Sequence, residues 1–240
     1  MRKTVCFVTS AYNNSTHLED CYESLREQTN PNWNWVILND MSSDDTFIVA
    51  NKIATSDEKE RVTIINHDIK KHTLKGIHDY VNNYNDFSEQ IIAILDGSDA
   101  LCNENTVELI LKEYNSNPEL DALWTSHSWD INGMNNSKEI PRNINPYQYP
   151  WVSSHLMTFK AHTLKKISKE NFQDLDGNWF KFGWDQALYI PILYVSRDRK
   201  FLDEACYLYK INTKFLENKV LTEKETHNTV KLVRARGFLS

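Results

Sequence analysis

Short apolar runs alternate with amphipathic segments along the first half of the chain. The runs are rich in β-branched residues and too short for buried helices, so they predict buried strands. They lie at residues 5–8, 33–38, 62–65, 91–95 and 121–126. The segments between them carry apolar residues at the spacing of a helix face, which predicts helices at 18–25, 46–54, 74–84 and 107–114. The alternation indicates βαβ units with right-handed crossovers, and therefore an α/β fold with a mostly parallel sheet flanked by helices.

The first helix carries the clearest local signals. Leu18, Cys21, Tyr22 and Leu25 follow the i, i+3, i+4, i+7 spacing. The segment Thr16-His17-Leu18-Glu19 just before and at its start has the capping-box pattern. We therefore predict a helix that begins under a side-chain cap from Thr16.

The second half of the chain has a different rhythm. Residues 132–149 are rich in Asn, Pro and Gly and residues 173–183 form a second turn-rich stretch, so both are predicted as loops. Strands are expected at 151–159 and 201–211, and helices at 184–195 and 222–236. No linker divides the sequence, which predicts one domain over residues 1–240. Long loops within a compact domain often form binding sites.

Composition narrows the class of protein. Hydrophobic residues at 40% and charged residues at 25% are typical of a soluble globular chain, and the net charge of -6 argues against nucleic-acid binding. Its four cysteines, Cys6, Cys21, Cys102 and Cys206, form no CxxC pair, which favours reduced thiols and a cytoplasmic protein. No apolar run approaches the roughly 20 residues that span a bilayer, so no transmembrane segment is predicted.

Acidic residues follow two of the predicted strands. Asp40 ends the run at 33–38, and Asp96 and Asp99 follow the run at 91–95. Ligands of open α/β sheets bind outside the carboxyl ends of the strands, and hard cations prefer carboxylate oxygen. This pattern predicts a site for a phosphorylated, metal-assisted ligand. The motifs GxGxxG, GxxxxGK[ST] and GxSxG do not occur, which argues against dinucleotide dehydrogenases, P-loop proteins and α/β-hydrolases.

Five segments, in order, resemble the family-2 glycosyltransferases. Thr9-Ser10-Ala11-Tyr12-Asn13 with residues 18–29 is similar to the family's opening strand and helix, which ends in Ser-Leu-x-x-Gln. Residues 39–46 resemble its Asp-Asp-Gly-Ser-x-Asp-x-Thr signature, and residues 95–99 resemble its Asp-x-Asp-Asp strand end. Residues 183–188 are similar to the segment that holds the catalytic acid, and residues 207–212 to the closing strand. The resemblance spans residues 4–212.

The resemblance implies a GT-A fold, which is Rossmann-like, and transfer of a sugar from a nucleotide-diphosphate donor. It further implies inversion, a divalent metal (Mn²⁺ or Mg²⁺), a donor-binding half at 1–126 and a loop-rich acceptor-binding half at 127–240. UDP-sugars are the favoured donors, and a carbohydrate or another hydroxyl compound is the expected acceptor. The residues implied in nucleotide-sugar binding are Thr9, Ala11, Tyr12, Asn13, Asp40, Lys71, Asp96, Gly97 and Ser98. Asp96 and Asp99 are implied as metal ligands.

On the donor side, the chemistry of the residues fits these roles. Asp40 can accept the ring N–H of a base beside Tyr12, although a carboxylate there can also cap the next helix. Lys70, Lys71 and Lys75 can contact phosphate or form a solvated charge run. Asp96 and Asp99 can stabilise the leaving diphosphate through a metal.

On the acceptor side, Asp185 is the predicted general base, since a carboxylate within reach of the acceptor hydroxyl can take its proton. The alternative is that Asp185 is an N-cap. Trp151 and Trp184 are predicted to stack on the acceptor sugar, with core packing as the alternative. His127 and His155 can supplement the metal ligands or serve the structure alone.

Two positions depart from the family pattern. Ser98 stands where the family usually has a metal-binding Asp, and Met41 stands where glycine is usual. A hydroxyl is a weaker ligand for a hard cation, so a catalytically silent nucleotide-sugar or glycan-binding protein is the second hypothesis. A nucleotidyltransferase is less favoured, because residues 13–16 are not a Gly-rich, basic loop.

Overall fold

Strands and helices alternate through a computed structural model that describes residues 3–83, 89–211 and 219–240. The first half contains β1 (Val5–Ala11), α1 (Leu18–Arg26), β2 (Trp33–Asn39), α2 (Thr46–Ser56), β3 (Val62–Asn66), α3 (His72–Asn83), β4 (Ile91–Ile94), β5 (Ala100–Leu101), α4 (Thr106–Ser116) and β6 (Leu120–Trp129). The second half contains the short 3-10 helices η1 (Pro146–Gln148) and η2 (Lys169–Phe172), with β7 (Met157–Lys160), α5 (Ala161–Lys165), α6 (Trp184–Val195), β8 (Asp198–Tyr209) and α7 (Lys219–Arg236).

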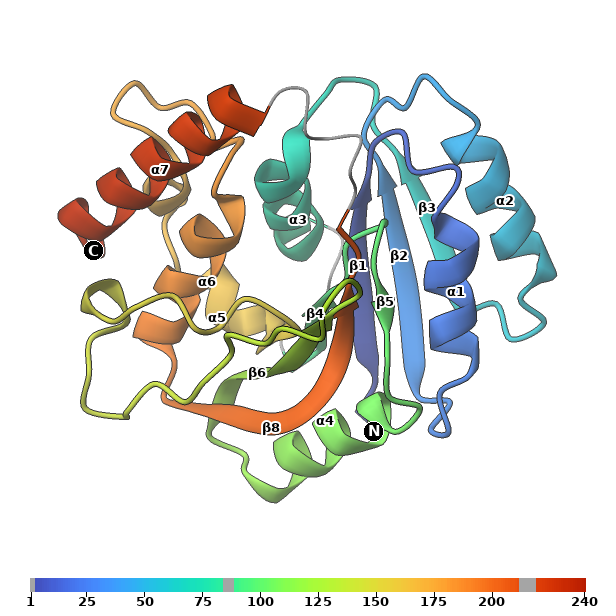
Figure 1. Ribbon diagram of the computed structural model, residues 1–240, viewed down its shortest axis with the longest axis horizontal. Coiled ribbons are helices and arrows are strands. Elements are labelled where there is room, and N and C mark those ends of the chain that lie inside the picture. Colours follow the sequence, from blue (N-terminus) through green and yellow to red (C-terminus); the bar gives the residue numbers. More distant parts are fainter. Residues whose placement is uncertain (1–2, 84–88, 212–218) are drawn as a thin grey trace.

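The strands form one sheet in the order β3-β2-β1-β4-β7-β6-β8-β5 (Figure 1). β1 to β4 are parallel, as predicted from the βαβ pattern. β7 runs antiparallel to both β4 and β6, β8 is parallel to β6, and β5 is antiparallel to β8. The prediction of an α/β fold is therefore confirmed, with a parallel half and a mixed half in one sheet.

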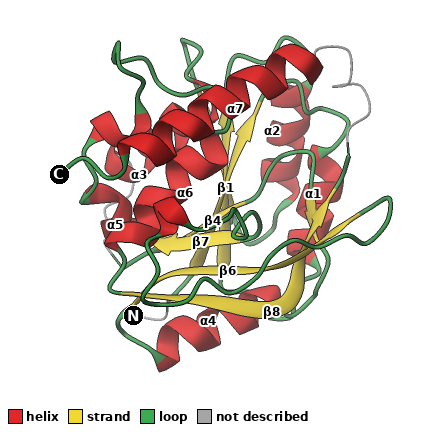
Figure 2. Ribbon diagram, turned by 60° about the vertical axis from the view of Figure 1, so that its left-hand side comes forward, coloured by secondary structure: helices red, strands yellow, loops and turns green. Residues whose placement is uncertain are grey.

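Helices cover both faces of this sheet (Figure 2). Side chains of α3, α5 and α6 pack on one face, and side chains of α1, α2 and α4 pack on the other. In β1, Cys6 and Val8 belong to the first core, whereas Val5 and Phe7 belong to the second. Successive strand residues point to opposite faces, so a strand buried on both sides needs an uninterrupted apolar run. That requirement explains the first apolar run of the sequence.

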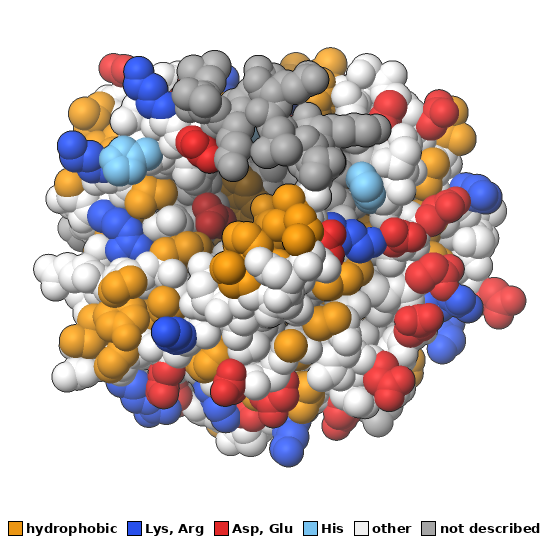
Figure 3. Space-filling model, in the orientation of Figure 1, with side chains coloured by type: hydrophobic (Ala, Val, Ile, Leu, Met, Phe, Trp, Pro, Cys, Tyr) orange, Lys and Arg blue, Asp and Glu red, His pale blue; other side chains and the backbone are white. Residues whose placement is uncertain are grey.

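The charge of the chain is visible on its surface. On the face drawn in Figure 3, acidic side chains gather at the right, where α1 lies in Figure 1. Glu19, Asp20 and Glu23 of α1 are exposed, while Leu18, Cys21 and Leu25 of the same helix are buried. No helix within the described ranges combines the length and the apolar character that crossing a membrane requires.

Two local predictions are wrong, and one short strand was missed. Helix α1 has His17 at its N-cap without a side-chain cap, so Thr16 does not close a capping box. The observed strand β7 is Met157–Lys160, so only the last three residues of the predicted strand at 151–159 are in a strand, and residues 151–156 are irregular. The short strand β5 was not predicted, because two residues carry no periodicity.

Candidate functional site

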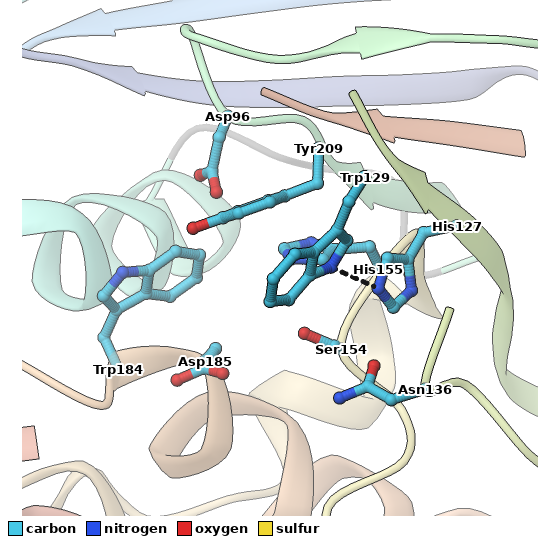
Figure 4. Close-up of a pocket in the computed structure, with 9 residues that line it drawn as sticks. All are labelled: Asp96, His127, Trp129, Asn136, Ser154, His155, Trp184, Asp185 and Tyr209. Carbon is cyan, nitrogen blue, oxygen red and sulfur yellow. Dashed lines mark hydrogen bonds between the residues drawn. The ribbon is translucent and has the colours of Figure 1, made fainter. Parts of the chain in front are cut away.

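A pocket of about 290 Å³ opens where the two halves of the sheet meet. Its wall combines carboxylates, aromatic rings and a few neutral polar groups from six parts of the chain (Figure 4). The lining residues are Asp96, His127, Trp129, Asn136, Ser154, His155, Trp184, Asp185 and Tyr209. Figure 4 shows Asp96 and Asp185 on opposite walls, with the rings of Trp184 and Tyr209 beside them. The structure thus brings together two carboxylates that the sequence analysis assigned to different motifs.

Asp96 lies two residues beyond β4 and is partly exposed to this pocket. Burial raises the pKa of the Asp96 carboxyl above its ordinary value, and the charges of Asp99 and Asp185 raise it further. The repulsion among three acidic groups is relieved when a proton, or a cation, binds between them. Asp96 is therefore well placed to receive a positive or hydrogen-bond-donating group of a ligand.

Asp99 lies behind Asp96 and is only 1% exposed. Its carboxylate accepts a hydrogen bond from the Tyr207 hydroxyl at 2.6 Å and another from the Lys210 N–H at 2.9 Å. The same Tyr207 oxygen accepts the Asp96 N–H at 3.2 Å. Asp99 thus holds the turn after β4 against β8 and does not line the pocket.

Asp185 lies in the first turn of α6, and the N-cap of that helix is Gly183. The alternative role of Asp185, as the N-cap of this helix, is therefore wrong. Burial raises the pKa of the Asp185 carboxyl, and the backbone N–H of Gln186 opposes the rise. The Trp151 indole N–H also interacts with this carboxylate, although not in hydrogen-bond geometry. A carboxyl with a raised pKa in a pocket is suited to accept a proton.

Stacked rings form the wall opposite α6. The His155 ring stacks on Tyr207 with 4.5 Å between centroids, and on Tyr209 at 5.3 Å. Burial lowers the pKa of His155 to about 3, so this imidazole is neutral. Trp129 packs on Tyr209 at 5.8 Å. The wall is thus apolar on its ring faces, which suits the apolar face of a sugar.

His127 is held as a neutral ring at the edge of the same wall. Its Nε2 accepts the indole N–H of Trp129 at 3.2 Å, and its Nδ1 lies 2.8 Å from the Ser137 hydroxyl. An indole N–H can only donate, so Nε2 is the acceptor and the proton of the neutral ring sits on Nδ1. Burial lowers the pKa of His127, in agreement with this state. The histidine thus orients Trp129.

Asp40 ends on the same edge of the sheet as Asp96, because β2, β1 and β4 are parallel neighbours. It is 2% exposed and lies outside the pocket. Its carboxylate accepts the N–H groups of Lys71 and His72 at 2.7 and 2.9 Å, and its Oδ1 lies 3.2 Å from His67 Nδ1. These hydrogen bonds hold the pKa of Asp40 below its ordinary value although burial would raise it. The carboxylate caps α3, whereas α2, the helix next in sequence, has Asp45 at its N-cap.

Tyr12 lies at the same edge and is 47% exposed. The Lys70 ammonium sits 3.0 Å from the centre of its ring. Lys71 and Lys75 both form ion pairs with Asp79, at 2.8 and 2.6 Å. The predicted wall for a base is therefore accessible, while two of the three lysines share an ion pair with the single carboxylate of Asp79.

The loop after β1 is fastened to the loop after β2. The Asn13 N–H donates to the Ser42 hydroxyl at 3.1 Å, and Asn13 Oδ1 accepts the Ser43 N–H at 2.9 Å. Met41 has φ of +59°, the left-handed conformation that glycine adopts without strain. The backbone at this position is left-handed, which explains the glycine of the family pattern. Met41 adopts the same conformation with backbone strain.

Three other predicted residues face the interior. Thr9 is fully buried, and its hydroxyl donates to the Leu95 carbonyl at 2.6 Å and accepts the Trp35 indole N–H at 2.8 Å. Ala11 is buried, and its carbonyl accepts the Asp40 N–H at 2.8 Å. Gly97 is packed so closely that an added Cβ would lie 3.2 Å from Thr9. These residues shape the turn beneath the site, and their ligand contacts stay predictions.

The fit to a divalent metal is incomplete. Within the described ranges, no group of three or more acidic, His or Cys side chains could hold a metal ion. Asp96 is the one residue of the strand-end motif whose carboxylate lines the pocket, since Asp99 is bonded to Tyr207 and Ser98 has no carboxylate. Mg²⁺ is commonly held by one or two carboxylates together with substrate phosphates. The motif can therefore contribute one protein ligand, with the rest left to the diphosphate of a donor.

Sequence reasoning missed several residues of the pocket. Trp129, Asn136 and Ser154 lie at a strand end or in loops, where no periodicity marks a functional side chain. Tyr209 belongs to the closing-strand motif but was assigned no role. Of the two predicted tryptophans, Trp184 lines the pocket, whereas Trp151 packs against the core beside Asp185.

Comparison with solved structures confirms the fold. S. aureus TarS matches with a TM-score of 0.65 and 15% identity over 92% of this chain and 39% of TarS. TarS 1–349 in complex with UDP-GlcNAc matches with a TM-score of 0.68 and 15% identity over 92% of this chain and 66% of that one. A mannosyltransferase from Pyrobaculum calidifontis in complex with GDP-Man and Mn²⁺ matches with a TM-score of 0.65 and 13% identity. The match covers 95% of this chain and 64% of that one. The chain thus spans between 39% and 66% of these structures.

The sequence itself was compared with family models and with curated proteins. No curated protein matches it. The model of glycosyl transferase family 2 matches residues 6–175, which is more than half of the chain and includes the first three motifs described above. The chain therefore belongs to glycosyl transferase family 2.

Proposed function

We propose that this protein transfers a sugar from a nucleotide-diphosphate sugar to a hydroxyl group of an acceptor. The observation that carries the proposal is the pocket in which Asp96, from a donor-binding motif, faces Asp185 beside aromatic rings. Residues 1–126 bind the donor and residues 127–240 supply the acceptor site. UDP-sugars are the first donors to test, because TarS binds UDP-GlcNAc, and GDP-mannose follows.

The donor lies along the edge formed by the carboxyl ends of β1, β2 and β4. Tyr12 offers a flat surface for the base, and Asp40 offers the acceptor for its ring N–H. Asp96 faces the diphosphate end. A divalent cation held by Asp96 and the diphosphate would neutralise the charge that develops on the leaving group.

Asp185 then acts on the acceptor. Its carboxylate takes the proton of the acceptor hydroxyl, whose oxygen attacks the anomeric carbon from the face opposite the diphosphate. The bond between that carbon and the diphosphate oxygen breaks, the electron pair leaves with the nucleoside diphosphate, and the configuration at carbon inverts. The raised pKa of Asp185 makes it a stronger base than an ordinary carboxylate.

The acceptor is a carbohydrate or another hydroxyl compound of a glycan-building pathway. Trp184 and Tyr209 present ring surfaces beside Asp185, with Trp151 next to the same carboxylate. Sugars expose patches of C–H groups that pack on such rings. A cytoplasmic location is proposed because all four cysteines are free thiols.

The substitution Asp185→Asn tests the proposal. We expect transfer to fall by about 10²–10⁴-fold, the usual contribution of general base catalysis, while calorimetry finds donor binding nearly unchanged. Asp176→Asn is the matched control, because Asp176 is exposed and lies outside the pocket. Transfer at the wild-type rate in Asp185→Asn would remove this residue from the mechanism.

The second candidate is a nucleotide-sugar or glycan-binding protein without catalytic activity. The hydrogen bonds that hold Asp99 away from the pocket are the observation that favours it. With Asp99 engaged by Tyr207 and Lys210, the motif offers the pocket a single carboxylate. A donor-hydrolysis and transfer assay, run with Mn²⁺, with Mg²⁺ and with a chelator, separates the two functions. Donor binding without turnover under any of these conditions would favour the silent protein.

A further inference from the structure

The C-terminal helix α7 packs across the start of α6, where Asp185 lies (Figures 1 and 2). Gly183, the N-cap of α6, has φ of +61°, and an added Cβ would lie 3.2 Å from the Thr226 carbonyl and 3.3 Å from the Val230 side chain. The contact is therefore tight at the residue from which α6 begins. A helix in this place can control the position of the first turn of α6.

Arg234 of α7 joins two segments of the site. Its Nε and one terminal nitrogen donate to Gln186 Oε1 at 3.2 and 3.1 Å. Its other terminal nitrogen donates to the carbonyls of Tyr147 and Tyr149 at 3.1 and 2.6 Å. The side chain is half-buried and uses the planar fork of the guanidinium on both sides.

Both segments lead to Asp185. Gln186 is the next residue in α6, and its backbone N–H lies near enough to the Asp185 carboxylate to oppose the rise of that carboxyl's pKa. Tyr149 precedes Trp151 by two residues, and the indole of Trp151 interacts with the same carboxylate. One guanidinium thus ties together the two chain segments that set the position of the proposed base.

Arg234 is held by neutral acceptors among the residues that the structure describes. Within the described ranges no carboxylate forms an ion pair with it, and burial lowers the pKa of the Arg234 guanidinium. A partly buried cation without a counter-ion is unfavourable unless its hydrogen bonds compensate. Arg234 therefore contributes through the geometry of its hydrogen bonds and not through an ion pair.

We infer that Arg234 is a positioning residue, which holds Asp185 in the geometry needed for proton transfer through Gln186 and the segment before Trp151. The inference rests on the proposed function, in which Asp185 is the general base. It extends that function to α7, which lies outside the residues matched by the family model. A displacement of the base by about 1 Å can lower a rate by about 10²-fold.

The test compares Arg234→Lys with Arg236→Lys. Arg236 is a matched control, because it lies in the same helix and also donates to two carbonyls, those of Gln173 and Asn171, at 2.8 and 3.0 Å. For Arg234→Lys we expect kcat for transfer to fall between about tenfold and 10²-fold, with the donor dissociation constant within about twofold of wild type. Arg236→Lys should keep the wild-type kcat.

Amide hydrogen exchange gives a readout that does not depend on turnover. The Gln186 N–H lies in the first turn of α6, where the helix itself provides no acceptor, so its exchange rate reports how well this turn is held in place beside Asp185. We expect Gln186 to exchange faster in Arg234→Lys and at the wild-type rate in Arg236→Lys. Gln186→Ala serves as a second variant, and its effect on kcat should not add to that of Arg234→Lys.

The role of Arg234 and the role of Asp185 can be refuted separately. Equal kcat and equal Gln186 exchange in the two lysine variants would overturn the role of Arg234, even if Asp185→Asn abolishes transfer. Retained transfer in Asp185→Asn would overturn the base itself, whatever Arg234→Lys does. Faster Gln186 exchange confined to Arg234→Lys, together with its loss of kcat, supports the positioning role.

Discussion

Tyr207 offers the sharpest test of how the acidic site is held together. The residue is fully buried on β8, donates to Asp99 at 2.6 Å and accepts the Asp96 N–H at 3.2 Å. The substitution Tyr207→Phe removes one oxygen atom and keeps the ring that stacks on His155. Its effect therefore isolates the two hydrogen bonds.

The destabilisation by Tyr207→Phe can be worked out from the two groups that lose a hydrogen-bond partner, the Asp99 carboxylate and the Asp96 N–H. A hydrogen bond to a charged group contributes about 1.5–3 kcal/mol, and a buried N–H without an acceptor costs about 1–3 kcal/mol. Partial relaxation of the turn after β4 makes the sum of these two costs smaller. We therefore expect Tyr207→Phe to lower the free energy of unfolding by about 3 kcal/mol at pH 8. For a chain of this size that lowers Tm by about 6–12 °C.

The loss should depend on pH. Burial raises the pKa of the Asp99 carboxyl, and the Tyr207 hydroxyl opposes the rise by bonding to the charged form. The charge-assisted bond is complete above this raised pKa and is lost as pH falls through it, because a protonated Asp99 is a weaker acceptor. The difference in free energy of unfolding between wild type and Tyr207→Phe should fall by roughly half between about pH 8 and about pH 5.

Urea denaturation at the two pH values measures the difference. Tyr189→Phe is the matched control, because Tyr189 is also fully buried but donates to the carbonyls of Leu123 and Thr158, which do not titrate. Its loss of stability should be the same at both pH values. An equal loss at both pH values for Tyr207→Phe would refute the assignment of the hydrogen bond to a charged Asp99.

Four further predictions follow from the site. Asp185→Asn should raise Tm above neutral pH, because burying the ionised carboxyl is unfavourable, and wild-type transfer should fall as pH drops through the raised pKa of Asp185. Gly183→Ala should cost about 2 kcal/mol in urea denaturation, because φ is +61° and Cβ would press on the Thr226 carbonyl. Met41→Gly should stabilise by about 1 kcal/mol in the same assay, since φ is +59°. Ser98→Asp should tighten Mn²⁺ binding by about tenfold in calorimetry, and lower Tm when a chelator is present.

Much of the first half of the chain was predictable from local pattern. An apolar run of four to six residues and an i, i+3, i+4 stripe each report burial of a short segment, so β1 to β4 and the helices between them were predicted near their observed bounds. The edge that carries Asp40 and Asp96 followed from parallel strands alone. Signals in the second half were weaker because its strands depend on distant partners. β8 pairs with both β6 and β5, and β7 pairs with β4 across a long stretch of sequence.

The chain's sequence by itself determined that acidic side chains end strands on one edge of an α/β sheet and that Asp185 stands at the start of a helix. The tertiary structure alone decided that Asp96 faces Asp185, that Asp99 turns away to Tyr207, and that Arg234 reaches both Gln186 and the segment before Trp151. Local pattern cannot decide such matters, because a carboxylate at a strand end has the same neighbours in sequence whether it faces a pocket or a tyrosine of another strand. Which it faces depends on the packing of segments that lie about a hundred residues apart, as Asp99 and Tyr207 do.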